Sequence, residues 1–255
     1  MKRASQGILL LLLAAVSCGR SNRAPSRLPG EKKEKTAFLV QFQGVRVPRD
    51  LVEPYVPFLL SRRPSLAPDS ARRFILLRFA LPMAWALKEA PRGFQESKAK
   101  VEKWLQRIHR GETTLEGILK EELRAFGQPE ELARPRTVLW TSLPLPLAQA
   151  VFAARPGRVE GPLRLPQGWC LFKVVKIQHG ITRDRDLVTL LQVVASPGGK
   201  AFWEKLRTFT RSLALAKGKI QVLDPSYEDV VPLILQKRGP SSRPAGTGDR
   251  QKKEK

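Results

Sequence analysis

The pattern of apolar and polar positions predicts that the folded part of the chain begins with a short pair of strands. Apolar residues alternate with other residues at positions 38–42, and the alternation resumes at 45–47 after Gly44. Glycine tolerates the backbone angles of a tight turn, so Gly44 is the predicted link between the two strands. A helix is predicted next, at residues 49–60.

The following helix carries an apolar stripe that repeats every three or four residues. Asp69 or Ser70 can cap its first turn, because short polar side chains accept hydrogen bonds from free backbone N–H groups. Pro82 lies within the pattern and is predicted to bend the helix, since proline has no N–H to donate. This spacing is typical of a helix packed against a core. The stripe consists of Leu76, Phe79, Met83 and Leu87.

Two further amphipathic helices are predicted at residues 96–109 and 115–123. In the first helix the apolar residues share one face and lysines occupy the others. Thr113 or Thr114 can cap the second helix, and Gly127 can end it.

After Pro135 the pattern changes to short strands separated by turn residues. Strands are predicted at residues 137–141 and 170–177, with a helical turn at 146–152 between them and a tight turn at Gly168. The remaining predicted elements are a helix at residues 200–217 and a strand at residues 219–223. This mixture of helices and strands predicts an α+β protein.

The start of the chain has the composition of an export signal. Lys2 and Arg3 precede an apolar run at residues 8–16, which is too short to cross a bilayer as a helix and ends just before Cys18. Residues 15–18, with the sequence Ala-Val-Ser-Cys, resemble the lipobox of bacterial lipoproteins. The resemblance implies a signal peptide at residues 1–18 and lipidation of Cys18, which would anchor the protein to an envelope membrane in the periplasm.

Cleavage without lipidation is the alternative, and it would leave Cys18 as a free or mispaired thiol. If Cys18 carries the lipid, Cys170 is the one cysteine that remains, and no intramolecular disulfide can form. The cysteine count therefore favours lipidation.

Both ends of the mature chain have compositions that oppose folding. Residues 19–36 are predicted to form a disordered tether, and residues 237–255 a disordered basic tail, because neither segment can bury enough apolar surface. The net charge of +23 suggests nucleic acid, but the charges are scattered and no nucleic-acid-binding motif accompanies them. We expect no nucleic-acid partner. The charge favours either anionic envelope polymers or lipid headgroups as partners, or an arginine-rich proteome without a binding role.

Residues 152–174 carry a motif of mixed residue types at fixed spacing, with the sequence F-A-A-R-P-G-R-V-E-G-P-L-R-L-P-Q-G-W-C-L-F-K-V. This segment resembles the C-terminal half of a parvulin-type peptidyl-prolyl isomerase domain. Residues 99–121 resemble the helices of the same family. Further upstream, residues 44–47 and the helix that runs to Ala90 resemble the N-terminal chaperone region of SurA- and PrsA-type periplasmic foldases.

The resemblance implies a fold and a set of domain boundaries. A helical chaperone-like region is followed by a parvulin-like (FKBP-like) sheet-and-helix domain, and a C-terminal helix packs back on the N-terminal region. The implied segments are a helical SurA-N-like region at 37–94, a parvulin-like domain at 95–178 and a C-terminal helical segment at 179–236.

The resemblance also implies a binding site for proline. Leu143, Leu147 and Phe152 match the apolar pocket of the family, with Trp140 nearby; the alternative is that these four side chains simply fill a core. Cys170 stands where the family has histidine, which makes it the candidate catalytic residue.

The rest of the family's polar cluster is missing. The family's first-strand Arg-His-Ile-Leu motif has no convincing counterpart, because residues 73–76 lie in a helical pattern and have Phe in place of His. His109 and His179 are predicted at surface positions. The sequence shows no metal-ligand spacing and no His, Asp and Ser arrangement, so no metal or cofactor is expected.

Together these features predict an envelope lipoprotein that acts as a foldase or chaperone. Its partners would be unfolded or nascent exported polypeptides that contain proline, bound through a degenerate parvulin-like domain. One alternative is an active peptidyl-prolyl cis-trans isomerase. A second is a structural lipoprotein that binds anionic envelope polymers.

Overall fold

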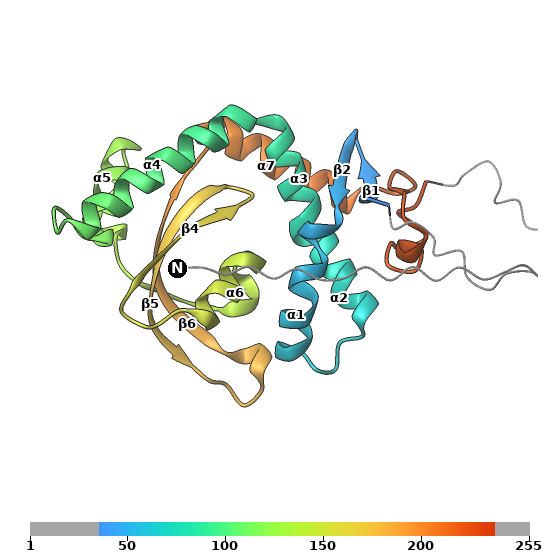
Figure 1. Ribbon diagram of the computed structural model, residues 1–255, viewed down its shortest axis with the longest axis horizontal. Coiled ribbons are helices and arrows are strands. Elements are labelled where there is room, and N and C mark those ends of the chain that lie inside the picture. The colour runs from blue at the N-terminus through green and yellow to red at the C-terminus, as the bar shows by residue number, and fades with distance from the viewer. Residues whose placement is uncertain (1–35, 238–255) are drawn as a thin grey trace, which may run out of the picture. The chain divides into compact units, whose positions relative to one another are not determined.

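The computed structural model describes residues 36–237, which contain two antiparallel sheets and seven α-helices (Figure 1). The predicted signal peptide at residues 1–18 lies outside the described residues, as do nearly all of the tether at 19–36 and the tail at 237–255.

The N-terminal hairpin forms as predicted. Strands β1 (Phe38–Phe42) and β2 (Val45–Pro48) are antiparallel, and Gly44 has a φ of 71° in the turn between them. Strand β7 (Gln221–Val222), which is shorter than predicted, adds to the other edge of β1. This small sheet therefore joins the two ends of the described chain.

The first predicted helix begins later than its pattern suggested. Two 3-10 turns, Arg49–Leu51 and Glu53–Tyr55, precede helix α1 (Val56–Arg62). Pro54 and Pro57 explain the delay, because neither can donate an N–H to a continuous helix and each lies in the first turn of a helical segment, where no donor is needed.

The second helix is split by a wide turn. Helix α2 (Pro68–Ile75) and helix α3 (Leu81–Glu89) flank a π-helical turn, Leu76–Ala80, which comes just before Pro82. The predicted cap is wrong: Ala67 precedes the first turn without a side-chain hydrogen bond, and Asp69 pairs with Arg72 at 2.9 Å instead.

The next two helices follow their predictions closely. Helix α4 (Pro91–His109) starts five residues early, and helix α5 (Leu115–Ala125) is capped by Thr114, whose Oγ1 accepts a hydrogen bond from the Gly117 N–H at 3.1 Å. Gly127, with a φ of 65°, follows the end of α5.

The larger sheet has the strand order β3-β6-β5-β4, all antiparallel. Its strands are β3 (Arg136–Leu139), β4 (Val159–Leu165), β5 (Gly168–Gln178) and β6 (Leu187–Ala195). Helix α6 (Leu145–Ala153) lies between β3 and β4 in the chain. Strand β6 lies between β3 and β5, so the sheet extends to residue 195 and the predicted domain boundary at 178 is wrong. The segment 179–236 is likewise not purely helical.

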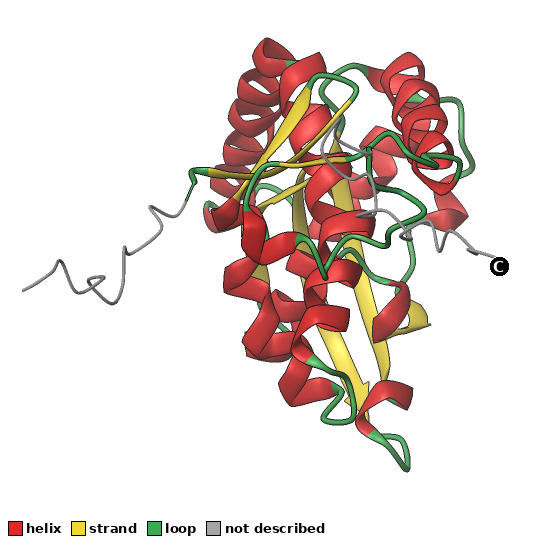
Figure 2. Ribbon diagram, turned by 90° about the vertical axis from the view of Figure 1, so that its right-hand side faces the viewer, coloured by secondary structure: helices red, strands yellow, loops and turns green. Residues whose placement is uncertain are grey.

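Both faces of the larger sheet are covered (Figures 1 and 2). On one face, Leu191 and Val193 of β6 pack with residues of α4 and α5, including Trp104. On the other face, Val188 and Leu190 join a core that includes α6 and the N-terminal helices. Because β6 is buried on both sides, its sequence is an apolar run without the alternation that marks a half-exposed strand.

The C-terminal part of the described chain packs back on the N-terminal region, as predicted. The Trp85 ring of α3 stacks on Phe209 of helix α7 (Gly199–Ala214), with ring centroids 5.0 Å apart. The hydroxyl of Tyr227, after β7, donates a hydrogen bond to Glu53 at 2.7 Å. No helix in the described part of the chain is long and apolar enough to cross a membrane.

Candidate functional site

The sequence-predicted site residues lie along the face of the larger sheet that α6 covers, but they fall into two different environments. Trp140 and Phe152 belong to a closed end. Trp140 is 2% exposed, and its indole Nε1 donates a hydrogen bond to the Arg183 carbonyl at 2.7 Å. Phe58 of α1 meets the rings of both Trp140 and Phe152, with centroids 5.9 and 6.2 Å away.

Arg62 covers this closed end from α1. Its guanidinium lies 3.7 Å from the centre of the Phe152 ring and forms an ion pair with Asp186, which is 1% exposed. Asp186 also accepts the Gly180 N–H at 2.9 Å and lies 3.2 Å from Nδ1 of His179. Burial raises the pKa of Asp186, but the Gly180 and His179 hydrogen bonds and the Arg62 charge outweigh it and hold that pKa below the usual value.

The contacts at the closed end make Trp140 and Phe152 packing residues between α1 and α6 in this structure. Trp140 is buried, and the partly buried ring of Phe152 already packs against Phe58 and Arg62, so these contacts do not support a binding role for the two aromatic residues.

Leu147 and Cys170 are less exposed than Trp140 and Phe152. Both are fully buried in the core that joins α6 to the sheet. Burial raises the pKa of the Cys170 thiol to about 12, so the thiol is neutral at pH 7 and is not the thiolate that reacts. The structure therefore gives no support to the predicted catalytic role of Cys170.

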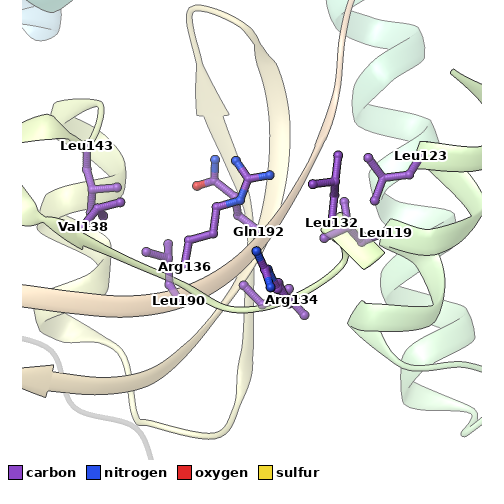
Figure 3. Close-up of a pocket in the computed structure, with 10 residues that line it drawn as sticks. Leu119, Leu123, Leu132, Arg134, Arg136, Val138, Leu143, Leu190 and Gln192 are labelled. Carbon is purple, nitrogen blue, oxygen red and sulfur yellow. The ribbon is translucent and has the colours of Figure 1, made fainter. Parts of the chain in front are cut away.

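Leu143 lies at the open end, where it lines a cavity of about 320 Å³ between β3, β6 and α5 (Figure 3). In Figure 3, Leu143 and Val138 lie on one side of this cavity and the leucines of α5 on the other. The lining residues are Leu119, Leu123, Leu132, Arg134, Arg136, Val138, Leu143, Leu190, Leu191 and Gln192. We call this space the Leu143 cavity.

Three polar side chains line the Leu143 cavity. Arg136 of β3 pairs in register with Leu190, so Gln192 is its diagonal neighbour on the same sheet face. Within the described residues, the side chains of Arg134, Arg136 and Gln192 have no hydrogen bond or ion pair. The cavity thus combines apolar walls with hydrogen-bond donors that are free to meet a ligand.

Sequence reasoning did not find these three residues. Arg136 and Val138 are two residues apart on β3, so their side chains point to the same face of the sheet. The cavity on that face could not be recognised without β6 as the neighbouring strand. Gln192 lies on β6 itself.

Two glycines of the motif at residues 152–174 are explained by the close packing of backbone segments around them. Gly168 has a φ of 135°, and a Cβ at this position would collide with the carbonyl oxygen of Ala195 on β6. Gly161 has a φ of 120°, and its Cβ would lie 2.7 Å from the carbonyl oxygen of Cys170. Both positions therefore require a residue without a side chain so that β4, β5 and β6 can approach one another.

Among residues 36–237, no group of three or more His, Cys, Asp or Glu side chains could hold a metal ion. His109 at the end of α4 and His179 after β5 are exposed, as predicted.

Comparison with known proteins identifies the segment around the cavity. Residues 87–187 match the family model of the PPIC-type PPIASE domain, from the end of α3 to the first residue of β6. No curated protein and no solved structure matches the chain. The likeness to the chaperone regions of SurA and PrsA stays a prediction. Residues 87–187 are therefore a PPIC-type, or parvulin-type, peptidyl-prolyl isomerase domain, as the sequence motif at residues 152–174 predicted.

Proposed function

We propose that this protein is a foldase or chaperone that binds unfolded, proline-containing polypeptides in the Leu143 cavity. The observation that carries the proposal is a largely apolar cavity with unpaired donors, formed by the PPIC-type domain together with strand β6 just beyond it. Its volume of about 320 Å³ is at the lower end of the range for small-ligand sites, which suits a proline ring and part of a neighbouring residue.

The polar groups of the cavity suit a peptide backbone. A proline residue offers no N–H, so the strongest hydrogen-bonding atoms near an X-Pro bond are carbonyl oxygens. Arg136, Arg134 and Gln192 supply the donors that such oxygens need. The same donors would not hold a purely apolar ligand, because they would lose water without gaining a partner.

Binding is better supported than catalysis. Rotation about a peptide bond faces a barrier of about 18–20 kcal/mol, and an enzyme lowers it only by stabilising the twisted amide more than the planar one. The buried, neutral Cys170 cannot contribute to that stabilisation in this structure. An active isomerase, in which Arg136 or Gln192 donates to the twisted amide, is the alternative.

The test uses the full chain and a fluorescein-labelled peptide that contains Ala-Pro, with a matched Ala-Ala peptide. We expect tighter binding of the proline peptide, and loss of at least tenfold in affinity in Leu143→Glu. Leu139→Glu is the matched control, because Leu139 ends strand β3 four residues before Leu143 but is 45% exposed and outside the cavity. Equal binding of the two peptides, or equal losses in the two variants, would overturn the proposal.

Catalysis is measured on the same proline peptide by magnetisation exchange between its cis and trans resonances. Binding without faster exchange supports a chaperone. Faster exchange that is lost in Leu143→Glu and kept in Leu139→Glu supports the isomerase instead.

The proposal includes delivery to the periplasm as a lipoprotein anchored to an envelope membrane, which rests on the sequence of residues 15–18. Labelling of cells with an alkyne fatty acid tests it. We expect label on the wild-type protein and none on Cys18→Ser, whereas label on neither protein would contradict the anchor.

A further inference from the structure

A second cavity, of about 480 Å³, is also lined by Leu143. One wall is formed by residues at the entrance of α6 and in the turn between β4 and β5, including Gln167. The other wall comes from the N-terminal helices and from α7, with Phe74, Arg78 and Leu206 among its residues. We call this space the Arg78 cavity. Much of it lies outside the segment that matches the PPIC-type family.

The two cavities are neighbours because one side chain, that of Leu143, lines both. An extended polypeptide advances about 3.3 Å per residue, so one or two residues are enough to pass a single leucine side chain. A chain whose proline occupies the Leu143 cavity would therefore place its next few residues in the Arg78 cavity.

Gln167 provides an independent sign that the Arg78 cavity is made for a polar ligand. Its Oε1 atom is buried and has no hydrogen-bond partner in the described part of the chain. Buried acceptors in folded proteins are nearly always paired, so this oxygen is suited to a donor from outside. A backbone N–H of a bound polypeptide is such a donor.

The charged side chains that line the two cavities are all arginines and therefore positive. Arg78 is exposed on the π-helical turn, and no carboxylate lies within ion-pair distance of it among residues 36–237. The same holds for Arg134 and Arg136 in the Leu143 cavity, and neither cavity is lined by an acidic side chain. Short π-helical turns are frequent at functional sites.

We infer that the two cavities form one groove for an extended, acidic polypeptide segment. The proline and its neighbour lie in the Leu143 cavity, the following or preceding residues lie in the Arg78 cavity, and their carboxylates face the three arginines. This inference rests on the proposed function for the Leu143 cavity, and it adds the N-terminal helices and α7 as a second part of the client-binding site.

The experiment compares three fluorescein-labelled peptides on the full chain. The first has four residues around Ala-Pro, the second extends it to twelve residues with glutamates on both sides, and the third replaces those glutamates by glutamines. We expect the acidic twelve-residue peptide to bind at least tenfold more tightly than the four-residue peptide. The advantage of the glutamates should shrink at high salt, because exposed charges are screened.

Arg78→Gln tests the second cavity directly. We expect it to weaken the acidic twelve-residue peptide by about two- to fivefold, the range typical of an exposed ion pair, and to leave the four-residue peptide unchanged. Arg92→Gln is the matched control, because Arg92 is exposed on α4 and lines neither cavity. Thermal unfolding should be the same in both variants, which excludes a folding defect.

The possible failures are distinguishable. If length and glutamates bring no gain and Arg78→Gln has no effect, while Leu143→Glu still abolishes binding of the short peptide, the single groove is wrong and the proposed function stands. If the acidic peptide binds equally well with alanine in place of proline, the proposed function is wrong. If no peptide binds, both are wrong.

Discussion

The two ends of the α6 face use the same kind of side chain in opposite ways. At the closed end, Arg62 lies against Phe152 and is neutralised by Asp186. At the open end, Arg136 lines a cavity and has no carboxylate partner in the described residues. One arginine holds α1 against the parvulin-type domain, and the other is available to a ligand.

The difference follows from burial. A charge removed from water is tolerated only when an opposite charge compensates it, so Arg62 at the buried end depends on Asp186. A charge at an open cavity keeps its water and needs no partner until a ligand arrives. Paired arginines therefore mark the structural part of this face, and unpaired ones mark the part that can bind.

The largest expected effect tests whether Leu147 is part of the closed core. Leu147→Asp would place a charge without a partner in a fully buried position, and we expect a loss of about 4 kcal/mol or more in the free energy of unfolding, or no folding at all. Urea denaturation measures it. A stable Leu147→Asp protein that has merely lost peptide binding would show instead that Leu147 lines the groove.

Asp186→Asn comes next, because it leaves the guanidinium of Arg62 without its counter-ion. We expect a loss of about 3 kcal/mol in the free energy of unfolding. A double-mutant cycle with Arg62→Met isolates the pair, and the combined variant should lose less than the sum of the two single losses. Additive losses would mean that the two residues do not interact.

Two buried carboxylates, Asp186 at the closed end and Asp224 after β7, should make the free energy of unfolding depend on pH. The pKa of Asp186 is lowered against burial by Gly180, His179 and Arg62, and that of Asp224 by Ser226 and Arg49. Since both pKa values lie below the unfolded value near 3.9, the folded protein binds fewer protons there. The free energy of unfolding should be constant above about pH 5 and fall as the pH drops through the folded pKa values.

Urea denaturation between pH 3 and pH 7 measures this dependence. In Asp186→Asn the fall should be shallower, because one of the carboxyl groups with a lowered pKa is gone. An identical slope in wild type and variant would exclude Asp186 as a source of acid sensitivity.

Leu143→Ala separates the open end from the closed one. Leu143 is only partly buried, so we expect a loss of about 1 kcal/mol in stability, below the range of about 2–5 kcal/mol for core leucines. Binding of the proline peptide should fall much more than stability. A large stability loss with unchanged binding would place Leu143 in the core instead.

The smallest effect is expected for Arg136→Gln. Because the guanidinium has no partner in the described residues, the free energy of unfolding should change by less than about 0.5 kcal/mol. Binding of the acidic peptide should weaken and become less sensitive to salt. A clear loss of stability would reveal a structural role for Arg136.

Local sequence signals were sufficient for several features. Thr114 caps α5 and the hairpin turns at Gly44, because each feature depends on neighbours within a few residues. The Asp69 cap failed, since Pro68 already begins the helix and Asp69 pairs with Arg72. The motif at residues 152–174 identified the family, and two of its glycines, Gly161 and Gly168, are required by close approaches between strands.

The sequence by itself determined the parvulin-type domain, the hairpin and most of the helices. Only the tertiary structure decided that β6 completes the sheet, that Cys170 and Leu147 are buried, and that Arg136 and Gln192 share a cavity. The physical reason is distance along the chain. Caps, turns and apolar stripes are set by residues a few positions apart, whereas burial and charge pairing depend on strands and helices that meet only when the chain has folded.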